Sequence, residues 1–344
     1  DGLLALSQRT LPAGTCPSVG ISGLTMAGGL GILMREHGLT IDSLLQAEIV
    51  LADGSIVMAS ATSNSDLFWA LRGGGLGSYG VVTKWWFQTL PYVQRITTKA
   101  IWNWSDFTSV YPAWELWLMG LPGTCYAGLS IKGKANTPPS FAVTMLGNEG
   151  TDSTLLAHLD QLAEYAGIPF ANTPAISNYP AVPTCISEDT QGVPTFYNSR
   201  LTNSPIGIDG ALALKSSFDI RAADPVVYAT EAFCLNDGLG GAVASVAPTA
   251  TSWVHREAIY SSQFASYSKT PSDATLDACQ RWQRDMYAAV APHYDAGCYQ
   301  GYWDPNIENW PELYYGENFT NLRVVKSKYD PTNFFRFQRS IPPL

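Results

Sequence analysis

The stretch that decides the fold is Gly14-Thr15-Cys16-Pro17-Ser18-Val19-Gly20, and further glycines follow it at positions 23, 28, 29 and 31. Glycines at this density let the backbone approach a ligand closely, and the N–H groups can hold a diphosphate. The stretch is not the dinucleotide-binding fingerprint, because no strand of a βαβ unit leads into it. Taken by itself, it fits an ordinary glycine-rich loop as well as a ligand-binding loop.

Signals for regular structure flank this loop on both sides. Before it, residues 3–9 resemble the end of a short helix. After it, Asp53-Gly54 is a strong hairpin-turn signal within residues 44–60. A short helix over residues 66–71 and a strand over residues 81–89 are predicted next.

The rest of the chain combines helices with strand-like runs. Residues 152–165 and 273–290 have the apolar spacing of amphipathic helices. Three runs have strand character, at residues 211–218, 229–235 and 253–267. In the last run, one face of an unbulged strand would carry His255, Glu257, Ile259, Ser261 and Gln263. The predicted fold class is therefore α+β.

Composition narrows the class of protein. The 344 residues suggest two domains, and 46% hydrophobic with 14% charged residues indicates a globular chain. A net charge of -9 argues against nucleic acid and anionic membranes as partners. The longest uncharged stretch, residues 10–34, contains too many glycines for a membrane span.

The cysteines and the glycosylation sequons indicate whether the protein is secreted. The six cysteines include no C-x-x-C pair and the four histidines are scattered, so no zinc pattern is present. Sequons at Asn103 and Asn318 favour glycosylation and a secreted protein, in which disulfides can form. Which cysteines pair cannot be read from their positions.

Several motifs occur together in a familiar order. The cysteine loop and Gly28-Gly29-Leu30-Gly31 are followed by Val50-Leu51-Ala52-Asp53-Gly54-Ser55, by Asp66-Leu67-Phe68-Trp69-Ala70-Leu71-Arg72-Gly73-Gly74-Gly75, and by Tyr314-Tyr315-Gly316-Glu317-Asn318-Phe319 near the end. This combination resembles the berberine bridge enzyme family, which are FAD-linked oxidases of the vanillyl-alcohol oxidase fold. The resemblance is strong at both ends of the chain and thin in the middle.

The resemblance implies FAD with a covalent bond from the sulfur of Cys16 to C6 of the flavin; a disulfide or a buried thiol is the alternative. The other FAD-binding residues that it implies are Thr15, Val19, Gly20, Gly23, Gly31, Gly80, Val82 and Tyr299. The family's second tether, a histidine in an N-terminal loop, is absent from this sequence. We therefore expect the rest of the FAD domain on a separate N-terminal chain, with a sequence that simply starts late as the alternative.

Val19 stands three residues after the cysteine. Family members that react with oxygen tend to have valine there, because a larger leucine takes the space beside the reactive flavin carbon. The resemblance thus implies an oxidase, and an ordinary packing role is the alternative.

For acid–base chemistry, Tyr302 matches the base of the family's carbohydrate oxidases, and Gly301 replaces the usual asparagine beside it. A tyrosine with a pKa near ~10 is a poor base at neutral pH unless a neighbour takes its proton. Asp237 matches the family's partner for this tyrosine, so the two would act as one relay. An Asp-Gly turn and a core tyrosine are the alternatives.

Three further residues are candidates for substrate contact: Gln263, Phe233 and His255. Phe233 would offer an aromatic face to a sugar, and His255 is equally compatible with a structural role. Residues 1–92 and 297–344 are expected to form the FAD part, and residues 93–296 a substrate domain.

The predicted reaction oxidises a hydroxyl, with a saccharide's anomeric carbon as first choice, to a lactone, with O2 reduced to H2O2. The alternatives are an oxidase of an alcohol, phenol or alkaloid-like metabolite, and a catalytically silent flavoprotein.

Overall fold

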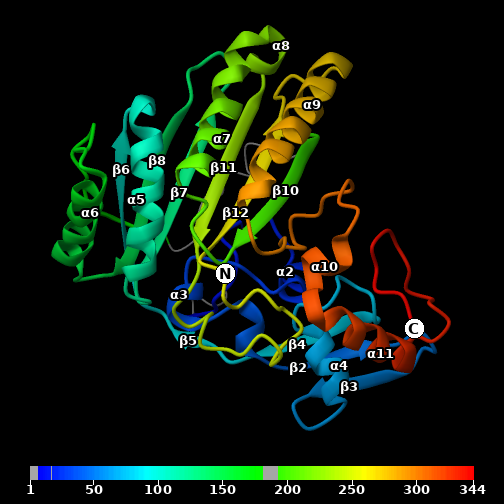
Figure 1. The fold of residues 1–344 in the computed structure, drawn as a ribbon. Helices are drawn as coiled ribbons and strands as arrows, with labels where there is room; N and C mark the ends of the chain where they lie inside the picture. Colours follow the sequence, from blue (N-terminus) through cyan, green and yellow to red (C-terminus); the bar gives the residue numbers. More distant parts are fainter. Residues whose placement is uncertain (1–6, 17, 181–192) are drawn as a thin grey trace.

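The computed structural model describes residues 7–16, 18–180 and 193–344 (Figure 1). It is a mixed α/β chain with one large sheet and one small sheet. The large sheet has seven strands and the small sheet three, while β1 (Arg9–Thr10) and β5 (Leu90–Pro91) form a short antiparallel pair beside them. Of residues 3–9, for which a helix end was expected, residues 3–6 lie outside the described residues, and residues 7–9 form a turn and the start of this short strand instead.

The small sheet lies in the part of the chain that follows the glycine-rich loop. Its antiparallel order is β3 (Ile56–Ser60), β2 (Leu44–Val50) and β4 (Val81–Phe87). The predicted hairpin is confirmed, because Gly54 takes the left-handed backbone that its turn needs, at a φ of 82°. The helix α4 (Ser65–Leu71) packs against it together with α10 (Trp310–Tyr315) and α11 (Phe319–Tyr329), so both ends of the chain share one core.

The large sheet is antiparallel throughout, in the order β10-β12-β11-β7-β8-β6-β9. Its strands are β6 (Arg95–Trp102), β7 (Tyr126–Gly133), β8 (Ser140–Asn148), β9 (Ser177–Asn178), β10 (Thr195–Thr202), β11 (Glu231–Gly238) and β12 (Tyr260–Tyr267).

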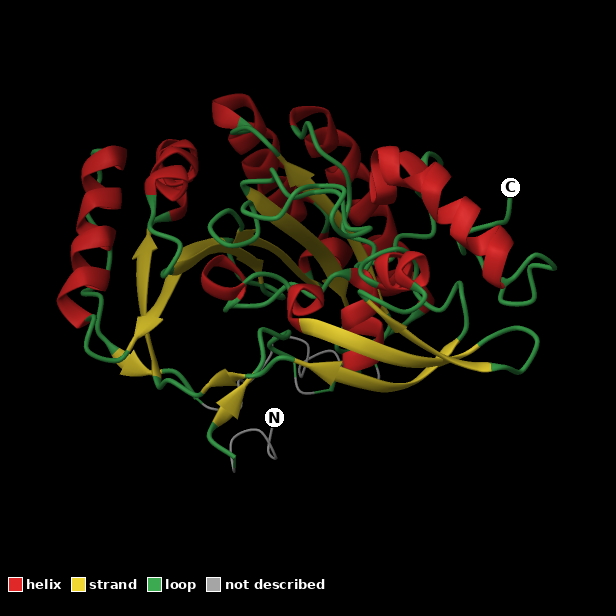
Figure 2. Cartoon of the chain, turned by 90° about the horizontal axis from the view of Figure 1, so that it is seen from below, coloured by secondary structure: helices red, strands yellow, loops and turns green. Residues whose placement is uncertain are grey.

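Helices cover one face of this sheet, as Figures 1 and 2 show from two sides. They are α5 (Phe107–Gly120), α6 (Asp152–Ala166), α7 (Gly207–Asp219), α8 (Pro225–Tyr228) and α9 (Asp273–Val290). Their apolar residues form the largest core with alternate residues of the strands. No helix in the described ranges is long and apolar enough to cross a membrane.

Short helical turns connect the cysteine loop to the sheets. They are α2 (Ile21–Ala27), α3 (Met34–His37) and a 3₁₀ turn at Thr40–Ser43. Together with the loop of residues 239–259 they build a third core, which also includes Leu201 from β10 and Tyr299.

Two strand predictions were wrong. Residues 211–218 lie in the helix α7, whose buried side chains Ala211, Leu214 and Phe218 follow a helical spacing. Of the run 253–267, only the part from Tyr260 is a strand. The preceding residues form a loop because Arg256, at its centre, makes an ion pair with Asp42.

Candidate active site

The face of the large sheet opposite the helices carries the candidate site. Directly opposed residues of antiparallel strands point to the same side, and Asp237 on β11 lies opposite Ser261 on β12 and Gly128 on β7. Gln263 on β12 lies opposite Leu235, two residues before Asp237. Asp237, Gln263 and Phe233 therefore share one face, while Asn236 and Cys234 point toward the helices.

Asp237 is half-buried and accepts a hydrogen bond at Oδ1 from the hydroxyl of Tyr126. Burial raises the pKa of the Asp237 carboxyl, and the bond from Tyr126 opposes that rise. A carboxylate with a raised pKa is a better proton acceptor near neutral pH than one in open water.

Tyr302 is held next to this carboxylate by its neighbours in the chain. The amide of Tyr299 donates to Ser199 Oγ at 2.9 Å, and the rings of Tyr299 and Tyr302 meet edge to face with centroids 5.0 Å apart. Burial and the nearby charge of Asp237 both raise the pKa of the Tyr302 phenol. Among the described residues, the bond to Asp237 comes from Tyr126, and Tyr302 donates none to it.

Steric packing explains why position 301, where the family has asparagine, is a glycine in this chain. A Cβ built on Gly301 would lie 2.5 Å from Cε1 of Tyr299 and 2.9 Å from its hydroxyl. The Tyr299 hydroxyl in turn accepts a hydrogen bond from the amide of Gly29, at 3.3 Å. The ring of Tyr299 thus occupies the space that a side chain at 301 would need.

A cavity of about 80 Å³ lies beside the cysteine loop. It is lined by Thr10, Leu11, Ala13, Gly14, Thr15, Ile32, Leu33, Tyr92, Val93, Arg95, Tyr179 and Pro180. Burial and the charge of Asp237 raise the pKa of Tyr179, which is one of the lining residues. Cofactor pockets are larger, roughly 300–1,000 Å³, so this cavity by itself does not hold a flavin ring.

The loop itself suits a cofactor. A Cβ at Gly20 or Gly23 would touch nothing within 4 Å, and Val19 is 51% exposed, so this backbone is open to a ligand. By contrast, Gly31 is pressed against the carbonyl of Ala13 and Gly80 against that of Val50. These two glycines shape the backbone rather than offer a surface, and Val82 packs against the small-sheet core. The residues present therefore fit FAD, with Gly20 and Gly23 as the open positions.

Cys16 takes part in a disulfide in the structure. The same sulfur cannot also bond to a flavin, so the disulfide and the predicted tether exclude each other. The cysteines at 125, 234, 279 and 298 are free and buried.

The three candidate substrate residues have different environments. Gln263 is half-buried on the polar face, whereas Phe233 is only 6% exposed within a small apolar cluster with Ala265 and Tyr267. His255 is buried against backbone groups of residues 298, 313 and 314, and its Nε2 has no hydrogen-bond partner among the residues that the structure describes. Burial lowers the pKa of His255 to about 4. This environment favours the structural role over substrate contact.

Of the two sequons, only Asn103 is exposed. Asn318 is buried, and its Nδ2 points at the carbonyls of Pro248, Thr251 and Ser252 at 3.2 to 3.4 Å. A glycan on that nitrogen has no room in the folded chain, so the expectation for Asn318 was wrong.

Two functional-site residues were missed from the sequence. Tyr126 begins a stretch in which Tyr126, Gly128, Ser130 and Lys132 alternate with apolar residues, and this period of two could have predicted a strand with a polar face. Arg35 is buried and donates to the carbonyls of Leu121 and Cys125 at 2.7 and 2.8 Å, and to that of Leu239. It thereby fixes the backbone beside both Tyr126 and Asp237.

Comparisons with known proteins identify the family to which the chain is similar. The family model described as "Berberine and berberine like" matches residues 298–342. The uncharacterized FAD-linked oxidoreductase YgaK of Bacillus subtilis is 32% identical over 346 residues, which are 97% of this chain and 73% of that protein. A chitooligosaccharide oxidase of Gibberella zeae is 30% identical, over 98% of this chain and 70% of its own length.

A solved structure of glucooligosaccharide oxidase from Acremonium strictum has a TM-score of 0.83 at 26% identity, over 100% of this chain and 75% of that one. It is described as carrying a 6-S-cysteinyl, 8α-N1-histidyl FAD. In each match a single longer chain contains the aligned part, which gives no support to the expected separate N-terminal chain.

Proposed function

The chain belongs to the berberine bridge enzyme-like family of FAD-linked oxidases, and on that premise we propose that it oxidises the anomeric hydroxyl of an oligosaccharide to a lactone. The observation that carries the proposal is the half-buried Asp237 on the sheet face opposite the helices, with Tyr302 packed near it so that the Asp237 charge raises the pKa of the phenol. Its saccharide-oxidising relatives support the choice of substrate class.

Tyr302 and Asp237 would handle the proton. Since the pKa of Tyr302 is raised, its phenol is protonated at neutral pH and cannot serve as a base alone. It can take the proton of the substrate hydroxyl only while passing its own to Asp237, whose raised pKa suits it to accept one. Gln263, on the same face, would orient the sugar through its amide.

FAD, when bound, supplies two-electron transfer from the substrate carbon to O2, so that the alcohol and O2 become the carbonyl compound and H2O2. Cys16 would hold it from the cysteine loop, with Thr15 and the open backbone at Gly20 and Gly23 nearby. Val19, exposed on this loop, would leave room for oxygen.

The test is peroxide release with a panel of oligosaccharides, compared with aromatic alcohols. We expect saccharide-dependent H2O2, and a 10²- to 10⁴-fold loss of kcat in Tyr302→Phe. Tyr165→Phe, on the exposed side of α6, is the control and should retain full activity. Oxidation of the aromatic alcohols but not of the saccharides would show that the substrate is an aromatic alcohol. Bound flavin that no substrate bleaches would indicate a catalytically silent flavoprotein.

The tether is tested by mass analysis of the peptide that contains Cys16, after denaturing electrophoresis under flavin fluorescence. FAD mass on this peptide is the expected result, and Cys16→Ala should abolish it. A peptide in which Cys16 is joined to another cysteine, as in the structure, would overturn the tether but not the oxidase assignment.

A further inference from the structure

Tyr126 reaches Asp237 through an unusual path along the sheet. Asp237 on β11 lies opposite Gly128 on β7, and Tyr126 stands two residues before Gly128 on the same face. The ring of Tyr126 folds back over Gly128, so that its hydroxyl donates to Asp237 Oδ1. The contact is diagonal across two neighbouring strands, a spacing that only a long side chain spans.

Gly128 is the residue that makes this path possible. A Cβ at Gly128 would lie 2.6 Å from the hydroxyl oxygen of Tyr126 and 3.2 Å from its Cζ. Gly128 is absent from the glycines with positive φ, so any residue could adopt its backbone conformation. The glycine is therefore needed for the space that Tyr126 occupies and not for the shape of the chain.

We propose that Tyr126 is a positioning residue for Asp237. Its hydroxyl, laid over Gly128, holds Oδ1 and leaves the other carboxylate oxygen to take the proton that Tyr302 releases. This inference rests on the proposed function for its consequence in catalysis, while the contact itself can be tested without any substrate.

The surroundings of Asp237 favour such an assignment. The titratable groups that interact with its charge are Tyr126 from β7, Tyr302 from the segment before α10, Tyr179 directly after β9, and Cys234, which points to the other face of the same strand. Only Tyr126 among them bonds to the carboxylate in the described part of the chain.

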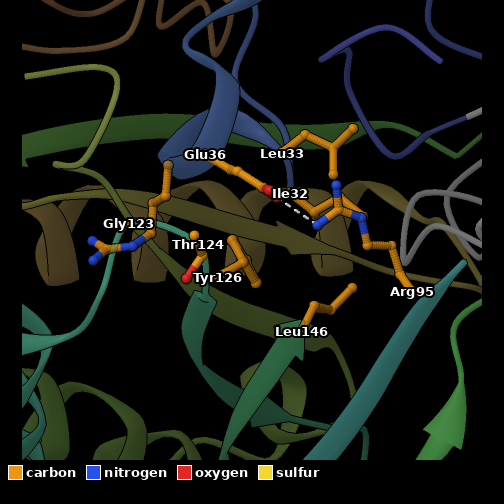
Figure 3. A pocket seen from close by; sticks show the side chains of 9 residues that line it. Ile32, Leu33, Glu36, Arg95, Gly123, Thr124, Tyr126 and Leu146 are labelled. Atoms are coloured by element: carbon orange, nitrogen blue, oxygen red, sulfur yellow. Dashed lines mark hydrogen bonds and ion pairs between the residues drawn. The ribbon is translucent and has the colours of Figure 1, made fainter. Parts of the chain in front are cut away.

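The nearest charged side chains are used elsewhere. Tyr126 also lines a cavity of about 10 Å³, into which Glu36 and Arg95 project while bonding to each other at 2.6 Å (Figure 3). Arg35 lines the same cavity but binds backbone carbonyls. The hydroxyl of Tyr126 is thus the group that offsets the burial of Asp237, and without it the pKa of the carboxyl rises.

The direct test is a ¹³C NMR titration of aspartate carboxyls in the full chain without substrate, with the Asp237 signal assigned from Asp237→Asn. Tyr126→Phe should raise the pKa of Asp237 by about one pH unit, since a hydrogen bond to a charged acceptor is worth that much. The matched control is Tyr111→Phe, which removes a buried hydroxyl that bonds to Asn236, on the other face of the same strand. An unmoved Asp237 titration in Tyr126→Phe, or an equal shift in Tyr111→Phe, would overturn the inference.

Gly128→Ala provides a second variant that keeps the hydroxyl but displaces it, so it should shift the titration in the same direction. In the active enzyme, the acidic limb of kcat/KM should move up by the same amount in Tyr126→Phe, and Tyr126→Phe should have no further effect in an Asp237→Asn background. A further loss in that background would show that Tyr126 acts independently of Asp237, and the inference would fail. If the wild type oxidises no saccharide, the proposed function fails, and the NMR titration still decides the role of Tyr126.

Discussion

Two glycines set the geometry of this site because they have no side chain. Gly128 and Gly301 each leave space that a neighbouring tyrosine ring fills, Tyr126 in one case and Tyr299 in the other. Gly301 departs from the family's motif, which has asparagine at this position. In the structure, an added side chain at 301 would displace Tyr299 and its bond to Gly29.

His255 is a neutral residue whose burial predicts a pH-dependent stability. Its pKa is about 4 in the folded chain against an ordinary value of 6.5, so the unfolded chain binds the proton more readily. The contribution of neutral His255 to the free energy of unfolding is complete above pH 6.5 and is lost as the pH falls toward 4. The total loss is about 3 kcal/mol at most. Chemical unfolding at several pH values should show this slope in the wild type and a flatter one in His255→Gln.

The control for this measurement is His158→Gln, at a half-exposed position on α6. Its pH slope should match that of the wild type. A His255→Gln slope that also matches the wild type would mean that His255 takes up a proton in the folded chain.

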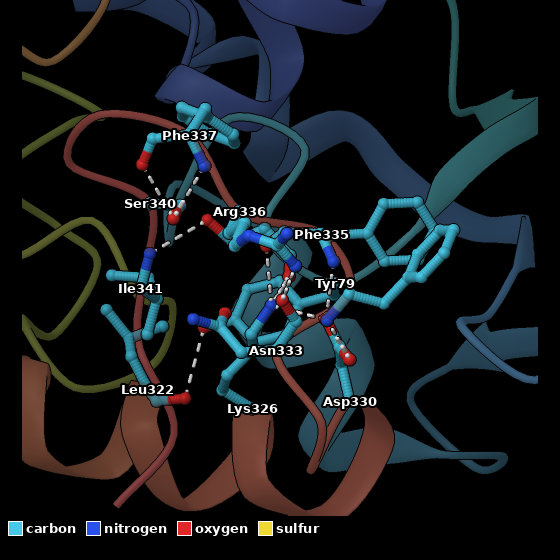
Figure 4. A network of polar contacts seen from close by, with 12 residues as sticks. Tyr79, Leu322, Lys326, Asp330, Asn333, Phe335, Arg336, Phe337, Ser340 and Ile341 are labelled. Atoms are coloured by element: carbon cyan, nitrogen blue, oxygen red, sulfur yellow. Dashed lines mark hydrogen bonds and ion pairs between the residues drawn. The ribbon is translucent and has the colours of Figure 1, made fainter.

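At the scale of elements, one buried ion pair connects the last helix to the C-terminal segment and to the loop before β4 (Figure 4). Lys326 Nζ donates to Asp330 Oδ2 at 2.6 Å, to the carbonyl of Ser78 at 2.6 Å and to that of Phe335 at 2.8 Å. Both charged side chains are fully buried. Lys326→Met leaves the Asp330 carboxylate without its cation, and we expect the free energy of unfolding to fall by about 3–5 kcal/mol.

Lys328→Met is the matched control for this pair. Lys328 lies on the same helix and bonds to Asp66 at the same 2.6 Å, but both partners are exposed to solvent. Its removal should change the unfolding midpoint little, because water screens an exposed pair. Equal losses of unfolding free energy in the two variants would show that burial does not determine how much each ion pair contributes to stability.

The elements also show where sequence reasoning succeeds and fails. The helix α9 begins and ends where its apolar spacing predicted, since Ser272 caps it with a hydrogen bond from the amide of Thr275. The sequence predicts a strand over residues 211–218, because eight mostly small and apolar residues fit the apolar repeat of a strand and that of a helix about equally well. The strands β6, β7 and β8 went unpredicted, although β7 alternates polar and apolar residues.

For the site, the motifs predict roles for the cysteine loop, Asp237 and Tyr302, and these stay predictions. They could not identify Tyr126, because that contact depends on the register of two strands that are more than 100 residues apart. The role of Arg35 could not be predicted either. Its partners are backbone carbonyls, which every residue has, so no residue type in the sequence indicates them. Contacts of this kind require coordinates.

At the scale of the whole molecule, the loop of residues 239–259 joins the two sheets. It lies within residues 93–296, the expected substrate domain, and it also packs on the other part of the chain: Trp69 Nε1 donates to Thr249 O at 2.9 Å and Ser252 Oγ to Ala70 O at 3.1 Å. The strongest contact is a bidentate pair in which Arg256 binds both oxygens of Asp42 at 2.8 Å. Because this loop follows Asp237 directly, its anchorage fixes the end of β11.

Asp42→Asn tests whether this loop makes the two parts behave as one unit. The side chain of Arg256 is 1% exposed, so losing its counter-charge should lower the free energy of unfolding by about 3–5 kcal/mol. Hydrogen exchange should then increase together in residues 28–42 and in residues 239–259, because each segment holds the other. Glu48→Gln, which breaks the exposed pair with Lys84 on the small sheet, should leave both segments protected. Faster exchange in residues 28–42 alone would show that the loop is held by its other contacts, and that the two parts open independently.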